Sequence, residues 1–212
     1  MSLSVGENLA ESFNFAKDGL IGHWVRWLLL AIIGAIPIVD FIFLGYAVKV
    51  LKGGNVAPEL DGWGKLFIDG IKLFFLVIAY LLIPIIVIIA GIFMGGLMGG
   101  IGTIITILGF ILALAFGIAA PMAAVRFSKT DSLGEGFNFS EIFKRIKSIG
   151  WGKYILSYAV LVIVLLLFCA LIAILDIMLT EWLQIGLILP IIIIPFLLLW
   201  KGKFYENLYS RE

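Results

Sequence analysis

The apolar stretch at residues 71–95 constrains this chain more than any other feature of its sequence. It reads IKLFFLVIAYLLIPIIVIIAGIFMG, and its one charged residue, Lys72, stands at its beginning. An apolar run of about 20 residues matches the roughly 30 Å hydrocarbon core of a bilayer, so this pattern is typical of a transmembrane helix. We predict a span over about residues 71–94, with Pro84 near its middle.

The composition extends this interpretation to the whole chain. Of its 212 residues, 63% are hydrophobic and 14% are charged, and the mean hydropathy is +1.18. A soluble domain is roughly half apolar and a quarter charged. We therefore predict an all-α, polytopic integral membrane protein that forms a single membrane domain over residues 1–212. Further spans are predicted at about 101–125, 151–179 and 182–205.

Short amphipathic interfacial helices are predicted to precede spans, at about 14–22, 61–70 and 138–149. Their candidate N-caps are Asn14, Asp61 and Asn138, and residues 1–12 are expected to be a loose tail. The likeness of FNFAKDGLIGHW (13–24) to FNFSEIFKRIKSIGW (137–151) is either a weak internal repeat or the shared composition of interfacial helices.

The third of these helices has the clearest pattern. Its apolar side chains recur at helical spacing and include Phe139 and Phe143, whereas Lys144, Arg145 and Lys147 fall on the opposite face. Such a helix suits a membrane surface. We expect its apolar face to turn towards lipid or towards the bundle.

The first apolar segment, residues 24–51, is too long for one upright span. As a straight helix it would extend roughly 42 Å, and Pro37 interrupts its middle because proline cannot donate to the helical ladder. Two structures remain open: one kinked and tilted span, or two half-helices that enter the membrane and return. We expect a break within residues 34–40.

Lysine and arginine indicate the orientation. They cluster at 48–72, 126–153 and 201–211, whereas the connections at 95–100 and 179–184 contain none. Because loops rich in these residues stay in the cytoplasm, we expect a multi-pass protein of the cell membrane with both long loops and the C-terminus cytoplasmic. Lys17 and Arg26 favour a cytoplasmic N-terminus as well, which requires segment 24–51 to return.

Two polar residues inside apolar segments are candidates for contact with a ligand or an ion. Asp40 is costly to place at membrane depth. It could bind a cation or relay a proton, or it could accept free backbone N–H groups at the start of a half-helix. Tyr80 needs a partner for its hydroxyl within a span, either in the protein or in a ligand.

Several function classes find no support in this sequence. The single cysteine, Cys169, has no partner for an internal disulfide, and the single histidine, His23, excludes a multi-histidine metal site. The motifs GxSxG, HExxH and the P-loop are absent, and a net charge of +1 provides no basic field for nucleic acid. We expect no enzymatic activity, cofactor, metal or nucleic-acid partner. Membrane lipids are the expected partners, with a protein partner or a homo-oligomer as a further possibility.

The stretch GYAVKVLKGGNVAPELDGWGKLFIDGIKLFFLVIAYLLIP (45–84) resembles an uncharacterised family of prokaryotic, mostly archaeal, membrane proteins catalogued as domain of unknown function 4013. The matching features are Gly45–Tyr46, Gly53, Pro58 to Leu60, Gly62–Trp63, Leu66–Phe67, Gly70 and Pro84. The resemblance implies a polytopic α-helical protein of the cell membrane and assigns no catalytic residues.

Two functions remain as hypotheses. The first is a non-catalytic accessory or scaffold protein that engages lipid or a partner through its cytoplasmic interfacial helices. The alternative is a small transporter or channel with a site near Asp40, because prolines such as Pro37, Pro84 and Pro121 break helices at membrane depth in many transporters.

Overall fold

The secondary structure of the residues that the structure describes consists of helices joined by short connections and one longer loop at 52–62. The computed structural model describes residues 3–183 and 188–211, leaving aside the side chains at 97–98, 179–183 and 188. In chain order the elements are α1 (Val5–Leu20), α2 (Trp24–Ala35), α3 (Asp40–Leu51), α4 (Trp63–Met98), α5 (Gly100–Thr130), the 3-10 helix η1 (Gly134–Phe137), α6 (Phe139–Ile149), α7 (Trp151–Leu183) and α8 (Ile188–Ser210). The all-α class predicted from the sequence is confirmed.

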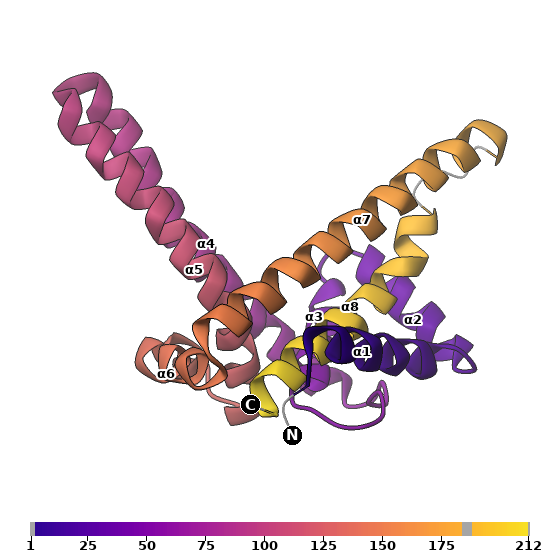
Figure 1. Cartoon of the computed structure of the whole chain (residues 1–212). Helices are drawn as coiled ribbons and strands as arrows, with labels where there is room; N and C mark the ends of the chain where they lie inside the picture. Colours follow the sequence, from indigo (N-terminus) through magenta and orange to yellow (C-terminus); the bar gives the residue numbers. More distant parts are fainter. Residues whose placement is uncertain (1–2, 184–187, 212) are drawn as a thin grey trace.

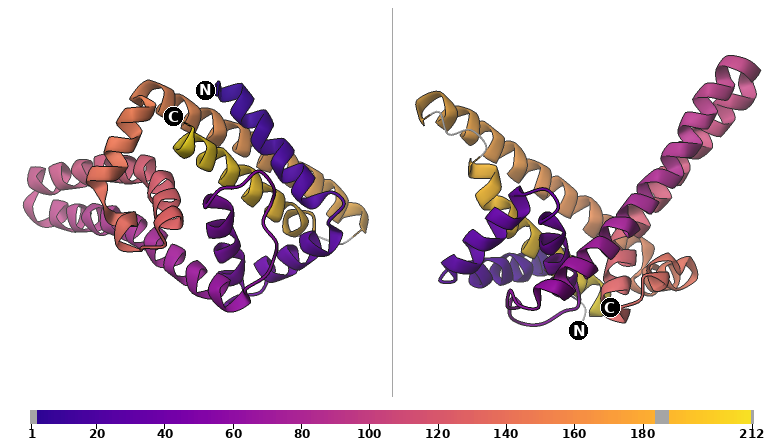
Figure 2. Two further views of the ribbon diagram at one scale, coloured as in Figure 1. Left: turned by 90° about the horizontal axis from the view of Figure 1, so that it is seen from below. Right: turned by 180° about the vertical axis from the view of Figure 1, so that it is seen from behind.

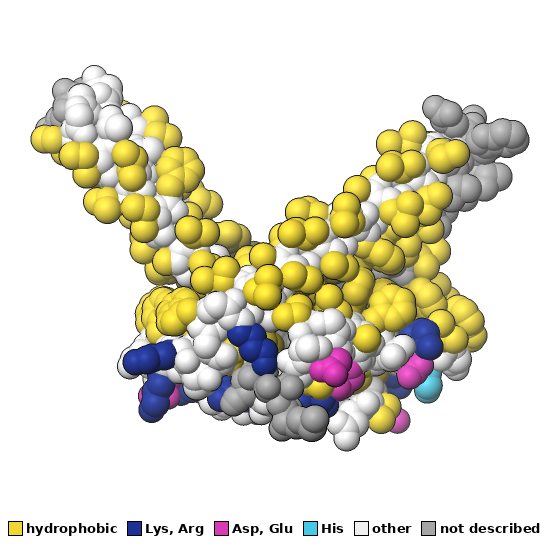
Figure 3. Space-filling view, viewed as in Figure 1, with side chains coloured by type: hydrophobic (Ala, Val, Ile, Leu, Met, Phe, Trp, Pro, Cys, Tyr) yellow, Lys and Arg dark blue, Asp and Glu magenta, His cyan; other side chains and the backbone are white. Residues whose placement is uncertain are grey.

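Two arms diverge from a common base (Figure 1). One arm is the hairpin of α4 and α5, and the other is α7 with the beginning of α8. The base contains α1, α2, α3, α6 and the ends of the long helices, and both chain termini lie there. Seen from below, α1 runs beside α8, and α6 lies under the α4–α5 arm (Figure 2). Hydrophobic side chains cover the arms, whereas the charged side chains gather on the base (Figure 3).

Three of the described helices are long and apolar enough to cross a membrane. They are the segments Trp63–Gly96, Gly100–Thr130 and Trp151–Met178. The pair α1 and α2, bent by 99° at its junction, also meets these criteria as a unit, so the described residues offer three spans or up to four. This is the character of a polytopic membrane protein. Among the described residues α8 does not qualify, and residues 184–187 of the predicted span 182–205 lie outside them.

The first helix differs from its prediction. α1 begins at Val5, so the predicted loose tail over residues 1–12 and the cap at Asn14 are wrong. The cap is Ser4, whose hydroxyl accepts a hydrogen bond from the Glu7 N–H (3.2 Å), while the Glu7 carboxylate accepts one from the Ser4 N–H (2.7 Å). This reciprocal pair is a capping box, and its Ser-x-x-Glu signature precedes the apolar residues of α1.

The predicted helix at 61–70 and the predicted span at 71–94 are one continuous helix, α4. The N-cap residue of α4 is Gly62, which has a φ of 70°. The predicted cap at Asp61 is wrong, because no side chain among the described residues caps this helix. Asp61 instead pairs with the Lys49 ammonium of α3. At α6, by contrast, the Asn138 side chain accepts a hydrogen bond from the Glu141 N–H (3.3 Å), as the spacing predicts.

Segment 24–51 is divided inside the expected interval. α2 ends at Ala35 and α3 begins at Asp40, and Ile38 between them has a φ of 73°, which is rare for a β-branched residue. Both helices lie on the base, and the chain leaves α3 into the loop at 52–62 on the lower side of the molecule (Figure 1). Segment 24–51 therefore consists of two helices of 12 residues each, and neither is long enough to cross a bilayer alone.

Glycines allow the closest helix contacts. A Cβ atom added at Gly45 of α3 would lie 1.8 Å from the Leu66 carbonyl oxygen, and one at Gly70 of α4 would lie 1.7 Å from that of Phe41. The α4–α5 hairpin is built similarly, since a Cβ at Gly102 would lie 2.0 Å from the Gly95 nitrogen. Small residues that let backbones touch are a common means of packing helices in membranes.

Candidate functional site

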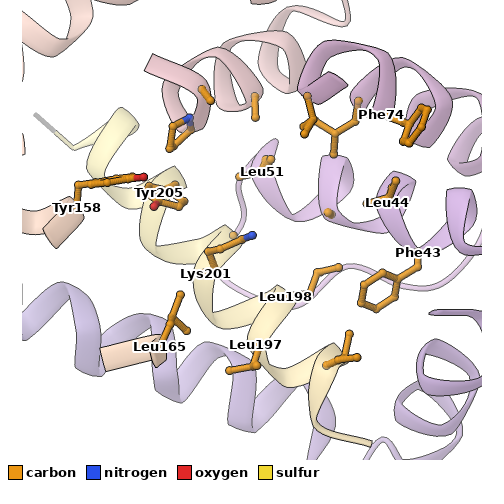
Figure 4. Close-up of a pocket in the computed structure, with 18 of the residues that line it drawn as sticks. Phe43, Leu44, Leu51, Phe74, Tyr158, Leu165, Leu197, Leu198, Lys201 and Tyr205 are labelled. Atoms are coloured by element: carbon orange, nitrogen blue, oxygen red, sulfur yellow. The ribbon is translucent and has the colours of Figure 1, made fainter. Parts of the chain in front are cut away.

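A cavity of about 740 Å³ lies between the two arms, where they leave the base. Its walls come from α3, α4 and α5 on one side and from α7 and α8 on the other, so residues distant in the sequence form one surface (Figure 4). Most of the lining is aliphatic or aromatic, including Phe43, Leu44, Phe74, Leu165, Leu197 and Leu198. The space-filling view shows the molecule hollowed between the arms (Figure 3).

Three side chains bring polar atoms to this apolar wall. Lys201 projects from α8 into the space between α8 and α3, and Tyr158 and Tyr205 lie beside it (Figure 4). The centroids of the two tyrosine rings are 6.5 Å apart. Lys201 is exposed, whereas its neighbours Trp200 and Gly202 are buried. Within the described residues no hydrogen bond or ion pair involves the Lys201 ammonium, and the lining contains no carboxylate.

A buried ionic cluster lies next to Lys201 along α8. The Lys203 ammonium is 2.8 Å from one Glu206 carboxylate oxygen, and Lys129 of α5 is 3.1 Å from the other. Burial raises the pKa of Glu206, but hydrogen bonds from Lys203 and Ser210 outweigh it and hold this pKa below its ordinary value. Lys203 also donates to the Gly54 carbonyl (2.9 Å). The cluster therefore joins α8, α5 and the loop after α3.

Amide side chains attach α1 to the same part of α8. The Asn8 side-chain N–H donates to the Phe204 carbonyl (3.1 Å), and the Asn207 side-chain N–H donates to the Asn8 side-chain oxygen (3.0 Å). The Trp200 indole N–H donates to the Leu9 carbonyl (3.2 Å). These contacts and the ionic cluster hold α8 against α1, α5 and the loop after α3, with the helix face that carries Lys201 turned towards the cavity.

A protein-family model matches the greater part of this chain. The model described as "Protein of unknown function (DUF4013)" matches residues 28–178, which is more than half of the chain. The chain belongs to this family. The resemblance drawn from residues 45–84 is thereby confirmed. No curated protein and no solved structure matches the chain. The DUF4013 match extends from α2 to α7, and α8, which carries Lys201 and the ionic cluster, follows it.

Within the DUF4013 region, Asp40 stands in the first turn of α3 and is half-buried. α3 has no side-chain cap hydrogen bond, and Asp40 is not part of the cavity lining. Its carboxylate is close to the N-terminal end of the α3 dipole, which favours a negative charge. The structure thus separates Asp40 from the polar groups between the arms.

Tyr80 is buried in α4, and its hydroxyl donates to the Gly136 carbonyl of η1 (2.8 Å). Its ring packs against Phe116, Phe137 and Phe139, with centroid distances of 5.2, 5.9 and 5.7 Å. The hydroxyl therefore has the partner that a buried tyrosine needs. In this arrangement Tyr80 fastens the segment before α6 to the arm.

The residues of α6 have three different surroundings. Phe139 belongs to the aromatic group around Tyr80, and Phe143 stacks on Trp151 with centroids 6.0 Å apart. Lys144 and Lys147 are exposed. Arg145 instead donates to the Tyr209 carbonyl (2.8 Å from its Nε) and lies over the Tyr209 ring at 5.2 Å. Arg145 thus contacts the end of α8, although its place in the helical pattern grouped it with the two lysines.

Lys201 is the residue that the sequence reasoning overlooked, because it opens a segment that looks like a polar tail. That segment is helical up to Ser210, and residues 202–208 are buried. The sequence does contain a pattern that could have indicated the role of Lys201. Leu197, Lys201 and Tyr205 are spaced four residues apart, and all three line the cavity. Such spacing places them on one helix face.

Proposed function

We propose that this protein is a non-catalytic accessory or scaffold protein of the membrane, whose base binds lipid head groups on the cytoplasmic side. The observation that carries the proposal is the separation of apolar arms from a charged base (Figure 3). A bilayer matches this arrangement, with hydrocarbon around the arms and head groups at the level of the base. The lysine- and arginine-rich loops belong to the base, and the tendency of such loops to remain in the cytoplasm supports the orientation.

Helix α6 is the part of the base best suited to this contact. Its buried residues Ile142, Ile146 and Ile149 attach it to the bundle, which leaves Lys144 and Lys147 free to face outwards. Phe143, 36% exposed, and Trp151, 43% exposed, lie beside these lysines. Exposed aromatic rings next to lysines are typical of the membrane interface, where the ammonium groups meet anionic lipids.

Depth measurements on reconstituted protein test this proposal. Single spin labels would be placed at positions 143 and 147 in a Cys169→Ser background, in vesicles that contain anionic lipid. We expect the label at 143 to sit just below the head groups and the label at 147 to sit among them. A label at position 64, on the exposed first turn of α4, is a control for the polar side of the base. Full water exposure at both α6 positions would overturn the proposal.

The alternative function, a small transporter or channel with its site near Asp40, makes a separate prediction. Because the first-turn charge is worth about 0.3–1 kcal/mol to a helix, we expect Asp40→Asn to lower the free energy of unfolding by less than about 1 kcal/mol. Thermal unfolding in detergent measures this, with Asp18→Asn, an exposed carboxylate of α1, as the control. If Asp40→Asn folded normally but abolished an ion flux of the parent protein, transport would replace the accessory role.

A further inference from the structure

We propose that the cavity between the arms is a binding site for one membrane lipid with an anionic phosphate head group. In this site Lys201 would pair with the phosphate, and the acyl chains would lie along the apolar walls. The site is separate from the surface of α6, because its residues come from α3, α4, α5, α7 and α8. The inference therefore does not depend on whether α6 contacts lipid.

The size and lining of the cavity suit an amphiphile. Its volume of about 740 Å³ lies within the roughly 300–1,000 Å³ typical of small-molecule sites. The walls include Val77 and Pro121 from one arm and Leu165 and Ile194 from the other. Because these helices belong to arms that can cross a membrane, the space between them faces hydrocarbon. A molecule that enters it laterally needs an apolar body, which a lipid has and a water-soluble metabolite lacks.

The charge of the site determines the head group. Among the lining residues that the structure describes, Lys201 is the one charged side chain, and no carboxylate accompanies it. The neighbouring ammonium groups of Lys203 and Lys129 both pair with the single carboxylate of Glu206, so this cluster offers no spare negative charge to Lys201. An unpaired lysine at an apolar surface is costly, so the site favours an anion and disfavours a cation. Tyr158 and Tyr205 bring two hydroxyl groups to the wall of the same cavity (Figure 4).

The cysteine at the cavity wall provides a direct probe. Cys169 is the only cysteine of the chain, is exposed, and lines the cavity. The full chain would be labelled there with a small fluorophore and placed in nanodiscs of phosphatidylcholine. Nitroxide-labelled phosphatidylglycerol or nitroxide-labelled phosphatidylcholine would then be added at equal mole fractions. Both lipids reach the outer surface of the arms, so the difference in quenching reports selective occupation of the cavity.

We expect the parent protein to prefer the anionic lipid by roughly fivefold, the ratio that corresponds to about 1 kcal/mol for one lysine near an anionic lipid. Lys201→Met should abolish the preference, whereas Lys201→Arg should retain it. The double substitution Lys144→Gln/Lys147→Gln, which removes charge from α6, should leave the preference unchanged. Equal quenching by the two lipids in the parent protein would overturn the proposal, as would an undiminished preference in Lys201→Met. Because the parent measurement stands alone, the proposal stays testable even if Lys201→Met fails to fold.

Discussion

Replacing Gly70 by alanine is expected to destabilise the protein strongly, because α3 and α4 cross in backbone contact at this residue. A Cβ atom there would lie 1.7 Å from the Phe41 carbonyl oxygen, 2.7 Å from its carbon and 2.8 Å from the Gly45 nitrogen. All three atoms belong to the backbone, so no side-chain rotation relieves the clash. Overpacking a core typically lowers the free energy of unfolding by roughly 1–3 kcal/mol. We expect Gly70→Ala to lower it by an amount at or above the upper end of this range.

The same helix contains a matched control. Gly64 is also in α4, and a Cβ atom added there meets nothing within 4 Å. Since alanine favours a helix interior over glycine by up to about 1 kcal/mol, Gly64→Ala should be neutral or slightly stabilising. Denaturant unfolding in mixed micelles, followed by circular dichroism, compares the two variants with the parent. Equal stability of Gly70→Ala and Gly64→Ala would show that α3 and α4 do not need their close approach.

Local patterns were sufficient to predict much of this fold. The apolar run at 71–95 forms most of the membrane part of α4, and Pro37 lies in the interruption between α2 and α3. Asn138, three residues before Glu141, caps α6. Each of these features depends on residues within a few positions of one another, or on the length of a single helix. A sequence displays such relationships directly.

The remainder depends on contacts between distant parts of the chain. Asn8 meets Phe204, and Arg145 meets Tyr209, and no spacing rule connects such pairs. The end of α8 looks like a polar tail because the partners that bury it come from α1, α5 and the loop at 53–54. The cavity around Lys201 escapes prediction for the same reason, since five helices contribute its walls.

The residues that carry the family resemblance are explained by these contacts as well. Gly45 and Gly70 permit the α3–α4 crossing, and the Tyr46 hydroxyl donates to the Pro58 carbonyl (2.8 Å), which holds the loop after α3 against that helix. Gly53 has a φ of 101° beside Glu206. The stretch that carries the family resemblance thus builds the corner between α3 and α4.

The ionic cluster on α8 gives the second large effect: Glu206→Gln is expected to destabilise the base. The Lys203 and Glu206 side chains are 5% and 7% exposed, so the substitution leaves a buried ammonium without its counter-charge. Removing one partner of a buried ion pair costs about 3–5 kcal/mol. Glu141→Gln on α6 is the control, because its exposed pair with Lys144 should contribute less than about 1 kcal/mol. Chemical unfolding at neutral pH measures both variants.

Acid should lower the stability of the parent protein in the same way, because it protonates the Glu206 carboxylate. Because the pKa of Glu206 is lowered in the folded state from 4.5, its contribution to stability is complete above that value and declines as the pH falls through the lowered folded pKa. Glu206→Gln has no carboxylate at this position, so its stability should fall less steeply between neutral pH and pH values below 4.5. Parallel acid profiles for the parent and for Glu206→Gln would contradict the assignment.

A double substitution separates the lost attraction from the cost of the isolated charge. If the penalty of Glu206→Gln comes from the unpaired Lys203 ammonium, Lys203→Met/Glu206→Gln should recover a large part of the stability, since methionine fills the space without a charge. Lys129 would also lose its carboxylate, but its side chain is 27% exposed and can reach water. No recovery in the double variant would instead mean that the Lys203 hydrogen bond to Gly54, and with it the attachment of the loop after α3, holds the base together.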